Sequence, residues 1–216
     1  MDTAVSLKKT SRRAAAVAAC LASLCAACPA RAVDLVPFAG FRFGGYLDTT
    51  SLAVNPQGPP SSLTLNGALS YGGLVDVPIS GPTALELYYS RQPTSLNGGG
   101  SLAAPPGDVT VSVMHLGLVE TVPSDDPQLS WFATGTFGAT RFDVSGGNLS
   151  RASLGLGGGF VWMPSKHIGL RADLRAILTF GGGGGSSIAC SGGCSVAISS
   201  SAIAQGEITL GILVRL

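Results

Sequence analysis

The chain has 216 residues, of which 12% are charged, and its formal net charge at pH 7 is +1. A charge balance so close to neutral excludes the basic surface on which nucleic-acid binding depends. Hydrophobic residues make up 45% of the chain and glycine contributes 31 residues, so most of the sequence is poor in charge and rich in small or apolar side chains.

The N-terminus has the three-part layout of a secretory signal peptide. Two lysines and two arginines between Lys8 and Arg13 precede the apolar run AAAVAACLASLCAAC, and ARA at Ala30–Ala32 matches a small-x-small cleavage site. The run is shorter than the roughly 20 residues of a membrane-spanning helix, which favours a cleaved signal over an anchor. We expect a signal peptide over residues 1–32 and one domain over 33–216, with eight basic and eleven acidic residues and a net charge of −3.

Eight segments after the signal alternate between apolar and polar residues with a period of two, the pattern of strands whose two faces meet different surroundings. In chain order they cover residues 35–45, 63–77, 83–92, 109–120, 129–142, 153–162, 167–180 and 206–216. Strands near ten residues long suit a tilted membrane crossing.

The seventh segment, HIGLRADLRAILTF, shows the alternation most clearly. Arg171, Asp173 and Arg175 occupy one face, whereas the other face is apolar from Ile168 to Phe180. A helix would point residues two apart in different directions, but a strand places them on one face. One face of this strand must therefore contact apolar surroundings, and we interpret these as lipid.

The connections between the segments differ in length in a regular way. They are long at residues 46–62, 93–108 and 181–205, and short at PISGP and MPSKH. Long loops on one side and short turns on the other are typical of bacterial outer-membrane barrels, and closure leaves no unpaired strand edge in hydrocarbon. The sequence predicts an all-β fold: an eight-stranded antiparallel up-and-down transmembrane β-barrel, preceded by the cleaved signal peptide.

Aromatic residues on the apolar faces lie toward strand ends, where a membrane girdle meets water. Trp131 and Trp162 lie next to short turns, whereas Phe43, Tyr89 and Phe180 lie toward the long loops. We predict that these five residues form the two aromatic girdles of the barrel.

The polar faces would fill the barrel interior, which in an eight-stranded barrel is only wide enough for side chains. An unpaired buried charge costs several kcal/mol, so a near balance of signs favours a network of salt bridges over an ion pathway. Gly155, Gly157 and Gly159 would leave room for the long side chains of the next strand. The predicted lumen network consists of Arg42, Asp76, Glu86, Glu120, Arg171, Asp173, Arg175, Glu207 and Arg215.

The sequence indicates no catalytic, cofactor or metal site. A general base would have to be His115 or His167; simple alternation puts His115 on the lipid side, although a bulge would turn it inward. No compact Ser-His-acid arrangement is evident. Cys190 and Cys194, an even pair in an exported chain, favour one disulfide that stiffens the last long loop, and a metal site there lacks further ligands.

The whole mature sequence resembles the small outer-membrane β-barrel proteins of Gram-negative bacteria, in the OmpA transmembrane-domain and OmpX-like superfamily. The resemblance lies in PFAGFRFGG, LYYSRQ, GTFGATRF, GGGFVWMPSKHIGLRADLR and the alternating C-terminal strand. It implies insertion into the cell outer membrane by the barrel-assembly machinery, and contact with membrane lipid and lipopolysaccharide. Leu216 departs from the family pattern, in which the last residue is usually aromatic.

Such a family resemblance does not settle function, because one fold carries many activities. We expect a monomeric barrel with a side-chain-filled lumen and a structural or surface-interaction role, acting through extracellular loops on an unidentified ligand. A narrow porin-like channel for small or apolar solutes is the alternative. We expect no enzyme and no cofactor, and a lipid-modifying enzyme remains a third class.

Overall fold

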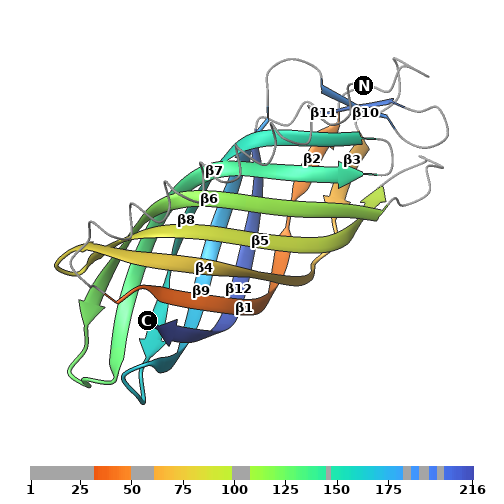
Figure 1. The fold of residues 1–216 in the computed structure, drawn as a ribbon. Coiled ribbons are helices and arrows are strands. Elements are labelled where there is room, and N and C mark those ends of the chain that lie inside the picture. Colours follow the sequence, from red (N-terminus) through yellow and green to blue (C-terminus); the bar gives the residue numbers. More distant parts are fainter. Residues whose placement is uncertain are drawn as a thin grey trace, which may run out of the picture. The chain divides into compact units, whose positions relative to one another are not determined.

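Eight long antiparallel strands form the wall of a barrel in the computed structural model (Figure 1). They are β1 (Asp34–Gly44), β4 (Ala68–Ser80), β5 (Thr83–Gly98), β6 (Asp108–Pro123), β7 (Leu129–Val144), β8 (Gly147–Trp162), β9 (Ile168–Phe180) and β12 (Ala202–Arg215). Four shorter strands extend the long-loop side: β2 (Tyr46–Thr49), β3 (Ser61–Leu65), β10 (Ser186–Ala189) and β11 (Ser195–Ile198).

The structure describes residues 32–49, 61–98, 108–144, 147–181, 186–189, 195–198 and 202–216. The predicted signal peptide, apart from its last residue, and the predicted Cys190–Cys194 disulfide lie outside the described residues. No helix within these ranges is long and apolar enough to span a membrane.

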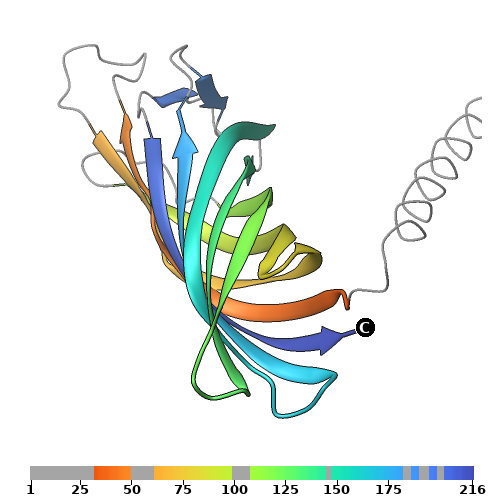
Figure 2. The same ribbon diagram turned by 90° about the vertical axis from the view of Figure 1, so that its left-hand side faces the viewer.

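Each long strand pairs with its neighbours along the chain, and β1 pairs with β12 to close the barrel. The register of closure places Asp34 opposite Arg215, so the first and last strands meet at the short-turn end. Figure 2 shows the strands tilted and coiled around a common axis. The prediction of an eight-stranded antiparallel up-and-down barrel is confirmed.

The predicted strands coincide with observed ones but are mostly shorter, and one of them, 63–77, is interrupted. Asn66 and Gly67 separate β3 from β4, because the Asn66 N–H donates to Ser95 O at 3.0 Å and the chain changes pairing partner there. At the end of β1, Gly44 and Gly45 have φ angles of 84° and 101°. L-residues rarely adopt this backbone conformation, so glycine allows the chain to turn between β1 and β2.

The outer face of the barrel is an apolar belt. Along β9 exposed and less exposed residues alternate strictly, and the exposed set consists of apolar side chains with Leu174 at 58%. Leu69 on β4 is 74% exposed and Phe137 on β7 is 66% exposed. A belt of this extent is far larger than the scattered apolar patches of a soluble monomer.

The interior holds two apolar clusters with charged residues between and beside them. The first reaches from the short-turn end into the middle and contains Val36, Phe38, Leu74, Tyr88, Val113, Ile177 and Leu213. The second lies toward the long loops and contains Leu65, Val109, Val111, Phe142 and Ile203.

Candidate functional site in the barrel interior

Two arginines of β9 reach across the lumen to carboxylates on β4 and β5. Arg171 Nη1 donates to Asp76 Oδ2 at 2.5 Å, and its Nη2 donates to Glu86 Oε2 at 2.7 Å. Arg175 Nη2 lies 2.9 Å from Glu86 Oε1 and 3.1 Å from Asp173 Oδ2. In the cyclic strand order β5 and β9 lie on opposite sides of the barrel, so the Arg171–Glu86 pair spans its full width.

A second ion pair joins β1 and β12 at directly paired positions. Arg42 Nη2 lies 3.1 Å from Glu207 Oε2, and both side chains are fully buried. Ser90 from β5 accepts from Arg42 Nη2 at 2.5 Å and donates to Glu207 Oε1 at 2.7 Å. The pair therefore binds to a third strand, which is not adjacent to either β1 or β12.

Tyr88 connects the two ion-pair groups. Its hydroxyl donates to Glu207 Oε2, and the guanidinium of Arg175 lies 4.0 Å above its ring centroid. Phe38 stacks on the Tyr88 ring at a centroid distance of 5.4 Å. Cation–π and stacking contacts of this kind help to hold a buried guanidinium in place, in addition to the ion pairs with its carboxylates.

Inward-facing glycines of β8 give these side chains room. A Cβ at Gly159 would lie 1.9 Å from Ala172 O and 2.9 Å from Phe132 Cζ, and the centroid of the Phe132 ring in turn lies 4.0 Å from the Arg171 guanidinium carbon. A Cβ at Gly157 would lie 3.4 Å from the Arg175 Cβ. Gly155, in contrast, leaves room for His115, whose Nδ1 would lie 3.0 Å from an added Cβ.

The structure brings together seven of the nine residues predicted for the lumen network, all at most 8% exposed. These are Arg42, Asp76, Glu86, Arg171, Asp173, Arg175 and Glu207. Sequence reasoning did not include Tyr88 and Ser90, although both share the inward face of β5 with Glu86. Their alternation with Leu87 and Tyr89 was the signal that could have identified them.

Two of the nine predicted residues do not join the network. Glu120 lies on the outer face of β6, because the inward positions of β6 are the odd-numbered ones. There its carboxylate accepts a hydrogen bond from Thr83 Oγ1 at 2.6 Å. Arg215 is at the short-turn end of β12, where its Nη2 lies 2.7 Å from Asp34 Oδ2. Its side chain is 39% exposed, so this pair belongs to the rim of the barrel.

His115 lies inside the barrel, not on the lipid side where simple alternation put it, and it reaches this position without a bulge. Val109, Val111 and Val113 face inward with it, whereas the small polar residues between them face outward. The pairing of β6 with β5 and β7 shows no register shift, so no bulge is involved.

Hydroxyl groups satisfy both nitrogens of the His115 ring. Nε2 lies 2.7 Å from Ser153 Oγ, and Nδ1 lies 3.1 Å from Thr136 Oγ1. Thr140 Oγ1 donates to Ser153 Oγ at 2.9 Å and continues the chain of hydroxyls. The Ser153–His115 distance suits a nucleophile and its base, but Thr136 occupies the place of an orienting carboxylate and Ser153 is 1% exposed. The geometry therefore describes a buried polar cluster in which hydroxyl groups satisfy the imidazole.

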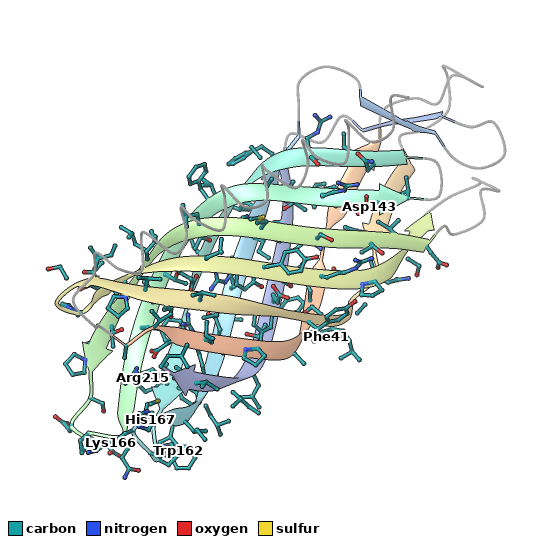
Figure 3. All side chains as sticks on the ribbon, in the orientation of Figure 1. Phe41, Asp143, Trp162, Lys166, His167 and Arg215 are labelled. Atoms are coloured by element: carbon teal, nitrogen blue, oxygen red, sulfur yellow. The ribbon has the colours of Figure 1, made fainter. Side chains whose placement is uncertain are left out.

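The five residues predicted for the girdles all lie on the outer face, between 41% and 52% exposed. Trp131 also contacts Phe160 edge-on, with ring centroids 5.8 Å apart. Figure 3 places Trp162 near Lys166 and His167 at the short-turn end, and Asp143 at the opposite end. Within the described residues no group of three or more His, Cys, Asp or Glu side chains is arranged to hold a metal ion.

No protein-family model and no curated protein matches the sequence. The structure is similar to outer membrane protein OprG from Pseudomonas aeruginosa, with a TM-score of 0.59, 13% identity, and 85% of this chain and 96% of that chain covered. It is similar to Neisserial surface protein A, with a TM-score of 0.57, 12% identity, and coverage of 85% and 97%. Outer membrane protein AlkL gives a TM-score of 0.50 at 10% identity, with coverage of 88% and 95%. The chain thus has the fold of the small outer-membrane β-barrels.

Proposed function

We propose that this chain is an outer-membrane barrel of a Gram-negative bacterium with a closed lumen, and that it acts at the cell surface through its long loops. In this role the barrel is a monomeric anchor that neither conducts solutes nor catalyses a reaction. The barrel-assembly machinery would insert it, and lipid and lipopolysaccharide would surround its outer face.

The observation that carries the proposal is the charged bridge across the lumen. Arg171 contacts Asp76, Glu86 and Asp173, at distances between 2.5 and 3.3 Å, and joins opposite walls of the barrel. Removing one partner of such a buried group costs about 3–5 kcal/mol, because it leaves an uncompensated charge. Opening a water-filled path along the axis would require breaking these contacts, so the closed state is strongly favoured.

The apolar belt supports the membrane location. Leu116 on β6 and Phe137 on β7 are paired neighbours that are 45% and 66% exposed, and exposed apolar side chains surround them. Burying such a surface contributes about 25 cal/mol per Å², so the chain gains stability when lipid covers it. The paired ends of β1 and β12 share the side of the short turns, which leaves the long connections on the opposite, extracellular side.

The proposal is tested on the expressed full-length chain. In unboiled samples of the outer-membrane fraction, a closed barrel migrates faster on a denaturing gel than the boiled protein does. The same purified barrel, reconstituted in a planar bilayer, should give no stepwise conductance above the lipid background. Recovery from the soluble periplasm without a mobility shift would refute the membrane location, and well-resolved conductance steps would refute the closed lumen.

A narrow channel is the alternative, and one observation favours it. Nε and Nη1 of Arg42 and of Arg175 are buried nitrogens with no hydrogen-bond partner within the described part of the chain. Buried N–H groups without a protein acceptor are commonly bound to water. A continuous file of such waters would give the conductance steps that the bilayer measurement detects.

A further inference from the structure

Two arginines face outward in a single row across four strands at the long-loop end. Arg91 on β5 is paired with Ser112 on β6, Ser112 with Arg141 on β7, and Arg141 with Ser150 on β8. Paired residues of adjacent strands project to the same face of the sheet, so the two guanidiniums and two hydroxyls form one strip. Arg91 and Arg141 are two strand spacings apart, about 9.6 Å.

The strip lies immediately above the apolar belt. Three rows of outward residues separate it from Glu120, the outward carboxylate near the short-turn end of β6. In register, these rows contain Tyr89, Met114, Ala139 and Ala152; then Leu87, Leu116, Phe137 and Leu154; then Leu85, Leu118, Gly135 and Leu156.

The height of the belt places the strip at the outer boundary of the membrane. Ser112 and Glu120 are eight residue steps apart, or about 26 Å along a strand at about 3.3 Å per residue. At a tilt of about 40° this distance corresponds to about 20 Å along the membrane normal. The outward apolar row of Val122, Trp131 and Phe160 beyond Glu120 adds to this height, in keeping with the apolar band of about 25 Å in such barrels. The next outward residues beyond the strip are polar, with Thr110, Asp143 and Asn148 in register.

Both arginines have hydrogen-bond donors to offer. The side chain of Arg91 is exposed and has no ion-pair or side-chain hydrogen-bond partner among the residues that the structure describes. Arg141 donates through Nε to Asp143 Oδ1 at 2.8 Å, which leaves its terminal nitrogens available, and its side chain is 52% exposed. An exposed pair of this kind contributes at most about 1 kcal/mol, so a stronger acceptor can compete with Asp143.

The strip is confined to one side of the barrel. The outer faces of β9, β12, β1 and β4 carry no cation at this level within the described ranges, and present aromatic and aliphatic residues such as Phe43 and Phe180. The remaining described cations face inward or lie at the short-turn end: Arg42, Arg151, Lys166, Arg171, Arg175 and Arg215.

We propose that Arg91 and Arg141, with the hydroxyls of Ser112 and Ser150, bind the phosphate groups of a glycolipid headgroup in the outer leaflet. Guanidinium groups bind phosphate through paired charge-assisted hydrogen bonds. A lipid whose acyl chains cover the apolar belt has its headgroup phosphates at the upper edge of the belt, at the level of the two arginines. The positive strip complements an anionic headgroup, while Leu87, Met114 and Phe137 below it contact the acyl chains. This inference rests on the proposed outer-membrane location.

The test compares lipid binding by the refolded full-length barrel and its variants in a neutral detergent, with a chelator present so that divalent cations do not bridge phosphates. The probe is fluorescent bisphosphorylated lipid A, and the comparison probe is the same lipid after enzymatic removal of both phosphates. We expect Arg91→Gln/Arg141→Gln to bind the bisphosphorylated probe about tenfold more weakly, a loss of two charge-assisted contacts partly screened by solvent.

Two further variants make the test specific. Lys166→Gln removes a cation at the opposite end of the barrel (Figure 3) and should bind like the wild type. Asp143→Asn frees Arg141 from its intramolecular acceptor and should strengthen binding, whereas a purely structural role of the Arg141–Asp143 pair predicts no gain.

The outcomes distinguish failure of the proposed headgroup site from failure of the proposed outer-membrane location. Equal binding of the bisphosphorylated probe by the double variant and the wild type, or equal binding of the two probes by the wild type, would overturn the headgroup site. Heat-modifiable migration is checked for every variant, so loss of binding counts only in a folded barrel. Absence of that migration in the wild type would overturn the outer-membrane barrel itself.

Discussion

Replacing Arg171 with glutamine tests how strongly the interior charges hold the barrel together. Arg171 contacts three carboxylates, those of Asp76, Glu86 and Asp173, and is 2% exposed. Its neutral replacement leaves Arg175 as the remaining cation for Glu86 and Asp173, and leaves Asp76 with no ion-pair partner among the described residues. Breaking a buried charge group in this way costs about 3–5 kcal/mol in the free energy of unfolding.

The matched control is Arg215→Gln. Arg215 also donates two hydrogen bonds to a carboxylate, at 2.8 and 2.7 Å, but its side chain is 39% exposed at the barrel rim. Solvent screens such a pair, so its loss should cost about 0–1 kcal/mol. The two variants therefore remove the same chemical group at two depths, and the difference between them measures the effect of burial.

The assay is urea unfolding of the refolded barrel in detergent micelles, followed by tryptophan fluorescence and by the heat-modifiable band. At a slope of about 3 kcal/mol per M, a loss of 3–5 kcal/mol lowers the unfolding midpoint by about 1–1.7 M. Arg215→Gln should shift it by no more than about 0.3 M. If Arg171→Gln and Arg215→Gln give midpoints that agree within error, the interior charges are solvated like surface charges, and the closed-lumen argument fails.

Two further predictions address the fit of the barrel wall and the outer belt. Gly159→Leu places a side chain against the Ala172 carbonyl oxygen, 1.9 Å from an added Cβ, and against Phe132, and should cost at least about 1–3 kcal/mol in the same urea assay. Gly135→Ala, where the nearest atom to an added Cβ is 3.9 Å away, should be nearly neutral, and an equal loss in both would contradict the packing argument. Phe137→Arg puts a cation in the middle of the belt and should cost about 2–4 kcal/mol in vesicles, with a small effect expected for Thr110→Arg beyond the belt. Equal tolerance of both arginines would mean that lipid does not cover Phe137.

The fold could be predicted from the sequence because membrane strands must satisfy two constraints at once. A period of two is needed wherever one face meets lipid, and β9 shows it over its whole length, from Ile168 to Phe180. The contrast between long loops and short turns then orders the strands. Both signals are local in the sequence, so they can be recognised without knowing which strands pair.

The two errors on β6 have a single physical origin. Simple alternation, with the apolar residues at the start of the strand facing lipid, puts His115 outside and Glu120 inside. A strand has only two faces, so one inverted assignment moved both residues to the wrong side. The inversion arose because the interior at the long-loop end is apolar, with Val109 and Val111 packed beside Phe142, while Thr110 and Ser112 face outward near the membrane boundary.

Depth along the axis was a separate difficulty. Arg215 has the inward parity of β12, as Glu207 does, yet it lies at the last residue of the strand and pairs with Asp34 at the rim. The ladder brings Arg42 opposite Glu207, but the contact between Arg171 and Glu86, 85 residues apart, requires closure of the whole barrel. The charge balance of the inward positions predicts that ion pairs form inside the lumen. Which carboxylate pairs with which arginine follows only from the order of the strands around the barrel.

The interior network has a consequence for strand register that does not depend on its net stability. A slip of β9 by one residue would turn Arg171, Asp173 and Arg175 toward lipid and Leu174 toward the lumen. A cation at the middle of the belt costs about 2–4 kcal/mol, so the slipped arrangement is disfavoured twice, by charge in lipid and by the unpaired carboxylates of β4 and β5. Apolar residues in these positions could fill the lumen equally well, but they would penalise the slip far less. The buried charges therefore distinguish the correct barrel from its nearest misregistered competitor, which explains why a chain so poor in charge concentrates three of them on one strand.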